Sequence, residues 1–150
     1  MRDSVGQLES LQDELATTLQ KSEFFAPMPI ITEKLQDIEN EIARALGSLG
    51  GVCVIVVTPR ARVGTPNLPG PQFDDVDIVV RVIENVIVNQ SATGTKIPAS
   101  AVAEQVAANL HHVHTASGKI ILCQQMGLVP DPDNLIYDVN FKTKFGVTKQ

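Results

Sequence analysis

The sequence predicts an α/β (α+β) fold in which helices pack on one face of a mixed or antiparallel four-stranded sheet. Three segments repeat apolar residues every three or four positions, which is the spacing of amphipathic helices. Four other segments are rich in β-branched residues or alternate apolar with polar ones, which is typical of strands. The chain has 150 residues, 43% of them hydrophobic and 19% charged, which is enough for one globular core. The expected order of elements is α-α-β-β-α-β-β.

The first expected helix covers residues 3–21 and carries one narrow apolar stripe. That stripe consists of Val5, Leu8, Leu11, Leu15 and Leu19. The prolines of "FFAPMPI" separate it from a second helix, which we expect to begin near Thr32 because threonine suits the N-cap position. We therefore expect residues 1–23 to form a helical extension that packs on a neighbouring molecule, and residues 24–150 to form a single α/β domain.

The segment "VCVIVVT" (52–58) is continuously apolar, which predicts a strand covered on both faces. The next segment, "PRARVGTPNLPGPQ" (59–72), contains four prolines and two glycines. It predicts a long loop, and long loops in compact domains often contact partners. Arg60 and Arg62 are the charged residues of this loop.

The segment "DDVDIVVRVIENVIVNQ" (74–90) alternates like a strand, but Glu84 interrupts its aliphatic row. A strand of about 14 residues would span over 40 Å at roughly 3.3 Å per residue, which is long for a domain of this size. We expect residues 76–82 to lie on the core and residues 84–89 to project beyond it, so that Val86 and Val88 are covered by a neighbouring subunit. The alternative is a bulge at Glu84 and Asn85 that turns the carboxylate to solvent.

The C-terminal half predicts one helix and two strands. The helix begins near Pro98 and buries Val102, Val106, Leu110 and Val113. The strand "KIILCQQ" follows, and then "LIYDVNFKTKF" alternates apolar residues with Asp138, Asn140, Lys142 and Lys144. The polar row of this last strand predicts a wet or partner-facing surface.

The sequence contains no pattern that predicts catalysis or metal binding. "SATGTK" lacks the first glycine and the residue order of a phosphate-binding loop. The three histidines of "HHVH" are better explained as a solvated helix end than as a zinc site. Cys53 and Cys123 lie in apolar runs, which predicts buried free thiols. We expect no catalytic, cofactor-binding or metal-binding residue, and therefore no enzyme.

The charge and hydropathy patterns argue against two further classes of protein. The net charge of −5 argues against a protein that binds the phosphate backbone of nucleic acid. The polar, acidic N-terminus does not resemble a secretory signal, and no apolar stretch approaches the roughly 20 residues of a membrane span.

A resemblance runs through residues 30–147. A strand ending "VVRVIENVIVNQ", the helix "ASAVAEQVAANLHHV" and a last strand "YDVNFKTKFGV" resemble the tail-terminator (tail-completion) proteins of long-tailed phages and prophages, and related minor tail and neck proteins. The likeness lies in the element order and in the pattern V-x-V-x-E-N-V-x-x-N. That pattern is formed by Val80, Val82, Glu84, Asn85, Val86 and Asn89.

The resemblance implies a structural virion protein that needs no cofactor. Such a subunit forms a ring, usually a hexamer, that caps the tail tube, stops its polymerisation and joins it to the head connector. Its partners would be other copies of itself, the tube protein and neck proteins, with DNA only as passing cargo, in a virion assembled in the host cytoplasm. The alternatives are another neck or head-completion adaptor, or a small hydrolase or nucleotide-binding domain. The expected interface residues are Arg60, Arg62, Glu84, Asn85, Val86, Val88, Asn89, Lys142 and Lys144.

Overall fold

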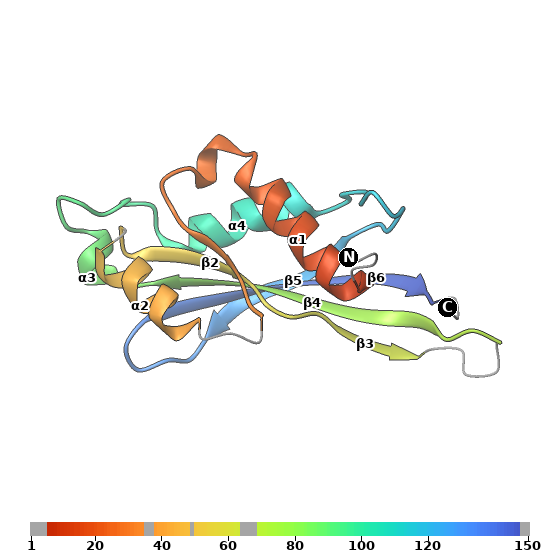
Figure 1. The fold of residues 1–150 in the computed structure, drawn as a ribbon. Coiled ribbons are helices and arrows are strands. Elements are labelled where there is room, and N and C mark those ends of the chain that lie inside the picture. Colours follow the sequence, from red (N-terminus) through yellow and green to blue (C-terminus); the bar gives the residue numbers. More distant parts are fainter. Residues whose placement is uncertain (1–5, 35–37, 49, 64–68, 148–150) are drawn as a thin grey trace.

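The computed structural model describes residues 6–34, 38–48, 50–63 and 69–147, and Figure 1 shows the arrangement of its elements. Val5, Leu35 and Leu49, which the expected helices included, lie outside the described residues. The helices are α1 (Gln7–Gln20), the short 3₁₀ helix η1 (Glu23–Phe25), α2 (Glu39–Ser48), α3 (Val86–Asn89) and α4 (Ala99–Leu110). The strands are β1 (Ile30–Thr32), β2 (Val52–Val56), β3 (Arg60–Val63), β4 (Gln72–Glu84), β5 (Leu122–Val129) and β6 (Leu135–Gly146).

The strands form one mixed sheet in the order β1-β2-β4-β6-β5, with β3 paired to β4. β1 runs parallel to β2, and the remaining pairs are antiparallel. The expected α+β class with a mixed sheet is confirmed, but the sheet has six strands where four were expected. β1 has three residues, too few for a periodic signal, and β3 lies within the segment whose prolines and glycines predicted a loop.

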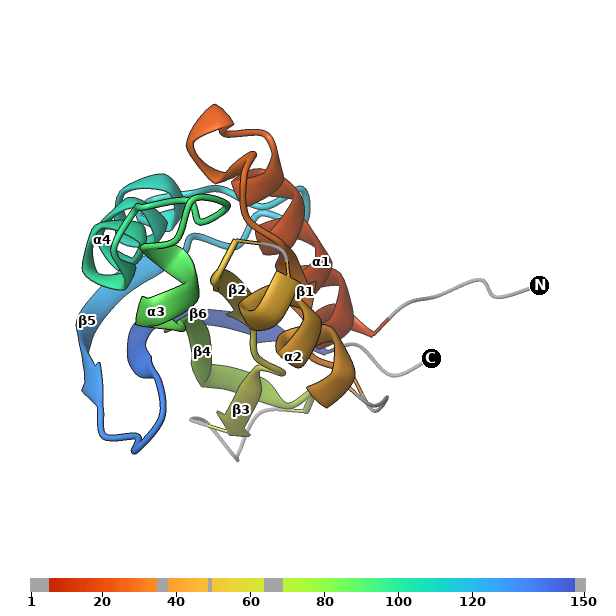
Figure 2. The same ribbon diagram turned by 90° about the vertical axis from the view of Figure 1, so that its left-hand side faces the viewer.

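Helices cover both faces of the sheet, where the sequence predicted cover on one. α1 and α4 lie side by side on one face, which we call the helix face (Figures 1 and 2). Val52, Val54 and Val56 of β2 point into that core. Cys53 and Ile55, which alternate with them, pack against α2 on the opposite face. The expectation that the 52–58 strand is covered on both faces is confirmed for β2, whose five residues are all buried. The cover on the second face comes from α2.

The stripe of α1 is buried in the main core of this chain. Leu11, Leu15 and Leu19 are almost fully buried, in one cluster with residues of β2, β4 and α4. Gln12 is buried too, and its side-chain amide donates hydrogen bonds to the backbone oxygens of Glu33 and Val56. This packing differs from the expected extension, because the leucine stripe faces the chain's own sheet. The predicted division into an extension (residues 1–23) and a domain (residues 24–150) stays a prediction. The packing of α1 in the same core as β2, β4 and α4 argues against it.

The long strand β4 ends at Glu84, so the expected projecting segment is not a strand. Residues Val76, Ile78, Val80 and Val82 lie on the core as expected. Directly afterwards the chain turns into α3, where the Asn85 side chain accepts a hydrogen bond from the backbone N–H of Val88 at 3.2 Å. An asparagine at the N-cap favours a helix start over continued strand. The sheet instead extends beyond α4 at its other end, where β3 lies (Figure 1).

We expect Leu15→Ala to lower the free energy of unfolding by about 2–5 kcal/mol, because the truncation leaves a cavity in the main core. Thr17→Ala, on the exposed side of the same helix, serves as the control and should change it by about 0.5 kcal/mol or less. Urea unfolding of both variants measures the difference. Equal midpoints would contradict the burial of α1 in the core and restore the view of an extension.

Candidate subunit interface

Glu84 is a buried carboxylate at the end of β4, with 2% of its surface exposed. One oxygen, Oε1, accepts a hydrogen bond from the backbone N–H of Ala99 at 2.8 Å, in the first turn of α4. The other oxygen, Oε2, accepts one from the side-chain amide of Asn89 at 2.8 Å. A helix N-terminus carries unpaired N–H groups and a positive partial charge, so it stabilises a carboxylate there. Glu84 therefore joins β4 to the start of α4.

Asn89, at the end of α3, uses all four of its side-chain hydrogen-bonding positions. Its amide nitrogen donates to Glu84 and to the backbone oxygen of Ile97 at 2.9 Å. Its amide oxygen accepts from the Thr95 hydroxyl at 2.5 Å and from the backbone N–H of Lys96 at 2.9 Å. The loop "SATGTK" is thus folded around Asn89, and the Thr95 hydroxyl and the Lys96 backbone N–H donate to Asn89.

Two glycines let the backbone close around Asn89. A Cβ atom on Gly94 would lie 2.0 Å from the Asn89 backbone oxygen, and one on Gly51 would lie 2.5 Å from its nitrogen. Gly51 also has a positive φ of 86°, which glycine adopts without strain. We call Glu84, Asn89 and the loop residues bonded to them the Glu84 clasp. Glu84 and Asn89 are buried and bonded to one another inside the subunit, and the interface role that the sequence predicted for both stays a prediction.

The clasp presents α3 as an exposed tip at one end of the sheet. Ile87 has 85% of its surface exposed and Val86 has 40%, whereas Val88 is half-buried. The two-residue period of a strand predicted Val86 and Val88 as the interface residues and did not include Ile87. Reading Asn85 as a helix N-cap would have placed Val86 and Ile87 together on the outer side of a helical turn.

The sheet face opposite α1 and α4 carries a network of ion pairs beyond the area that α2 covers. Lys142 on β6 lies between Asp75 and Asp77 of β4 and pairs with both, at 2.5 Å from Asp77. Arg62 on β3 pairs with the same carboxylates at 3.4 and 3.7 Å. The hydrogen bond from Lys142, together with Arg62, holds the pKa of Asp75 below its usual range. The hydrogen bonds to Asp75 and Asp77 in turn raise the pKa of Lys142.

A second ion pair extends this charged face along β4 and β6. Arg81 donates two hydrogen bonds to the carboxylate of Asp138, at 2.8 and 2.9 Å. The predicted alternation of the last strand is therefore confirmed: Val139 and Phe141 are buried on the helix face, and Asp138 and Lys142 lie on the opposite one. Two residues of the polar row, Asp138 and Lys142, are thus engaged in ion pairs within the subunit.

The remaining predicted interface residues lie at the β3 end of the sheet. Arg60 and Lys144 are exposed, and the described residues give neither of them an ion-pair partner. Arg60 belongs to β3 and not to a loop, while residues 64–68 of the predicted loop lie outside the described residues. Whether these side chains contact a partner stays a prediction.

The strand β5 is an exposed edge that the sequence analysis did not select. Met126 has 45% of its surface exposed and Leu128 has 58%, although both lie on the helix face of the sheet. Leu135, which is 40% exposed, starts the neighbouring strand β6 on that face. The signal that the sequence does contain is the uncharged run "LCQQMGLV". Adjacent exposed apolar side chains on one element are typical of a contact surface.

The histidines and cysteines do not assemble a metal site. Among the described residues, no group of three or more His, Cys, Asp or Glu side chains could hold a metal ion. His111 accepts a hydrogen bond from the backbone N–H of Cys123 at 2.9 Å through Nδ1. Cys53 is buried as predicted, which raises the pKa of its thiol to about 12, while Cys123 is half-buried. In the part of the chain that the structure describes, no helix combines the length and the apolar character needed to cross a membrane.

Comparison with known proteins gives a likeness in fold. The chain is similar to one from a solved structure described as the virion of a native gene transfer agent (GTA) particle, with a TM-score of 0.65 and 16% sequence identity. The likeness covers 96% of this chain and 100% of that chain. No family model and no curated protein matches the sequence. The arrangement of helices and strands is therefore shared with a chain of that particle.

We expect Glu84→Gln to lower the free energy of unfolding by about 1–3 kcal/mol, because a glutamine amide has one acceptor oxygen for two buried donors. The NH₂ group would face either the Ala99 N–H or the Asn89 amide. Glu104→Gln, which removes the same charge from an exposed position of α4, is the matched control. If urea unfolding gave the two variants the same midpoint, the clasp would not stabilise the fold as described.

Proposed function

We propose that this protein is a structural subunit of a phage-like virion, and that it acts there as a tail terminator. In this role, copies of the chain form a ring, a hexamer by the family resemblance, at the end of the tail tube. The ring stops tube polymerisation and joins the tail to the head connector. The protein would reside in the tail or neck of a virion assembled in the host cytoplasm.

The observation that carries this proposal is the likeness in fold to a chain of a gene transfer agent virion. It extends over 96% of this chain and the whole of the other, so it is not confined to a common small motif. The resemblance in the pattern V-x-V-x-E-N-V-x-x-N agrees with this proposal, and Glu84 and Asn89 of that pattern build the clasp that sets the positions of α3 and α4.

The exposed surfaces of the subunit also support a protein that acts by assembly. Ile87 at the α3 tip, together with Met126 and Leu128 on β5, presents apolar area that water contacts in the isolated subunit. Covering such area is the main favourable contribution to association. The role proposed here needs contacts with other copies, with the tube and with the neck. It needs neither a catalytic group nor a cofactor, and DNA passes through the ring without a sequence-specific contact.

We expect the purified protein to form closed rings, visible by negative-stain electron microscopy, and to elute as a hexamer in size-exclusion chromatography with light scattering. Tails assembled without it should exceed their normal length, because nothing stops tube growth. Immunogold labelling should find the protein at one tail end.

The variant Ile87→Asp tests the contribution of the α3 tip to this assembly. Because Ile87 is so exposed, the variant should fold normally but lose the ability to terminate tails, since a carboxylate would be buried in the contact. Thr17→Asp adds the same charge on the outer side of α1 and is the control. A wild-type protein that stays monomeric at every concentration and is absent from tail ends would refute the terminator role. A monomer that binds the connector alone would instead favour a neck adaptor.

A further inference from the structure

The first residues of β5 are covered on their outer edge by the chain that precedes the strand. The backbone N–H of His112 donates to the Ile121 oxygen at 2.7 Å, and that of Ile121 donates to the Val113 oxygen at 3.0 Å. The Cys123 N–H reaches His111. From residue 124 to residue 129 no described residue pairs with the outer edge of β5, which is the last strand on that side of the sheet. This leaves an open edge with the sequence "QQMGLV".

This open edge lacks the usual protection against pairing with another chain. Natural edge strands are short, carry lysine or other charges, contain proline, or are covered by another segment. Residues 124–129 have no charge and no proline, and nearly all of them are exposed. An unprotected edge of this kind would promote aggregation. We therefore expect another chain to cover it in the assembled state.

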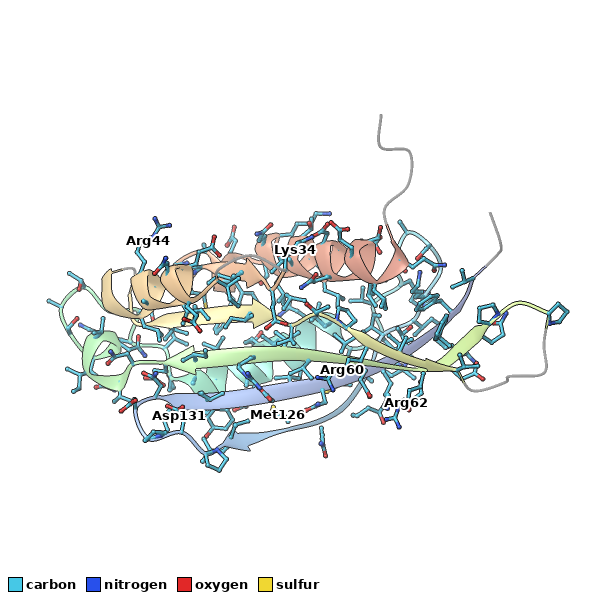
Figure 3. All side chains as sticks on the ribbon, turned by 60° about the horizontal axis from the view of Figure 1, so that its bottom comes forward. Lys34, Arg44, Arg60, Arg62, Met126 and Asp131 are labelled. Atoms are coloured by element: carbon cyan, nitrogen blue, oxygen red, sulfur yellow. The ribbon has the colours of Figure 1, made fainter. Side chains whose placement is uncertain are left out.

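A second open edge lies on the opposite side of the same sheet. β3 pairs with β4 and with no other described strand, and it lies on the side of β4 that faces away from β6 and β5. Figure 3 shows Met126 on the β5 side of the sheet and Arg62 at the β3 end. Two open edges on opposite sides of one sheet are what a head-to-tail contact between identical subunits requires, and such contacts form rings when the rotation closes.

The helix-face side chains of the two edges are both apolar. On β5, Met126 and Leu128 lie opposite Val139 and Tyr137 of β6, which fixes them on the helix face. On β3, Ala61 and Val63 lie opposite Val76 and Phe73 of β4, on that same face, and Val63 is 47% exposed. If the two strands pair, these four side chains come together and cover one another.

On the opposite face, the side chains of the two edges are polar or small except for Val129, which lies opposite Ile136 of β6. Gln125 and Gly127 of β5 lie opposite Asn140 and Asp138, on the face that carries the ion pairs. Arg60 and Arg62 of β3 lie opposite Asp77 and Asp75, on that same face. Arginine is a hydrogen-bond donor without acceptor capacity, and a glutamine side-chain oxygen is an acceptor. Pairing would therefore place arginines beside a neutral strand that can accept their hydrogen bonds, without bringing like charges together.

The two edges are displaced from one another along the sheet. Residues 125–129 lie level with residues 79–83 of β4, through their shared pairing with β6. β3 lies beside residues 73–77 of β4. Joining the edges of successive subunits would therefore shift each sheet along its strands relative to the next. Strands that close into a ring must be staggered and tilted in this way.

From this match we propose that the open edge of β5 in one copy pairs with the open edge of β3 in the next copy, so that the sheets of neighbouring subunits join around the ring. The partner is thus a second copy of this chain, held by backbone hydrogen bonds and by side chains that match on each face. The inference rests on the ring that the proposed function requires, and it specifies which strands hold that ring together.

Disulfide trapping tests the pairing in the full-length chain. The background carries Cys123→Ala, while Cys53 is retained because its buried thiol, with a pKa of about 12, is unreactive. Four double variants are made in this background. Each combines Gln125→Cys or Gly127→Cys on β5 with Arg60→Cys or Arg62→Cys on β3. Within one chain the β5 and β3 positions lie at opposite edges of the sheet, so a disulfide between them joins two copies. The matched control is Met126→Cys with Arg62→Cys. Met126 is the neighbour of Gln125 and Gly127 on β5 but lies on the helix face, whereas Arg62 lies on the opposite face.

We expect at least one of the four same-face pairs to give disulfide-linked multimers on a non-reducing gel, and the mixed-face control to give none, because adjacent strands bring only same-face residues within bonding range. Met126→Cys with Ala61→Cys, both on the helix face, should also link. Rings by electron microscopy with no same-face link, or with equal linking of the mixed-face control, would overturn the β5–β3 pairing and leave the ring intact. A protein that is monomeric throughout would overturn both the ring and the pairing.

Discussion

The position of Glu84 at the end of a buried strand constrains the rest of the domain. A carboxylate taken out of water must be paired or hydrogen-bonded, because an uncompensated buried charge costs several kcal/mol. Two donors meet that requirement here, one from the first turn of α4 and one from the Asn89 amide. The first ties β4 to the helix that covers it. The second ties β4 to the loop that leads into that helix, because Asn89 is itself held by Thr95, Lys96 and Ile97.

The same constraint explains why the molecule has an exposed tip. With Glu84 and Asn89 fixed inside the subunit, the residues between them must leave the interior and return within one helical turn. Asn85 caps that turn, and Val86 and Ile87 are placed on its outer side. The apolar tip is thus the geometric consequence of a polar interior contact. The interruption of an aliphatic row by a carboxylate marks the point where the strand ends and the chain turns.

Local periodicity in the sequence was enough to predict the elements whose pattern is long. The helix at Ala99–Leu110, the double-sided burial of β2 and the alternation of β6 were all predicted, because each depends on residues close in sequence. β1 and β3 were missed because three or four residues give no periodic signal. The place of α1 in the core was also missed, since whether a narrow stripe faces its own sheet or a neighbour depends on packing.

The candidate interface divides in the same way. Arg60 and Lys144 lie at the surface where the sequence predicted them, whereas Glu84 and Asn89 lie inside. To predict that Ile87 is exposed, one must first recognise that a helix and not a strand begins at Asn85. Met126 and Leu128 required knowledge that β5 is the last strand of the sheet, which follows only from the topology.

The charges on the open sheet face bear on which surfaces are left for assembly. The ion pairs of Asp75, Asp77, Arg62 and Lys142 are exposed and solvated, so they add little to the stability of the fold. The hydrogen bond between Asp75 and Lys142 lowers the pKa of Asp75 and raises that of Lys142, so this pair stays charged across the ordinary pH range. A hydrated, charged face disfavours the stacking of one sheet on another, because contact would remove water from every pair. The open edge of β5 carries no such penalty, because its residues have no charge to desolvate. The arrangement of charge therefore favours a contact at the β5 edge over a contact through the open face of the sheet.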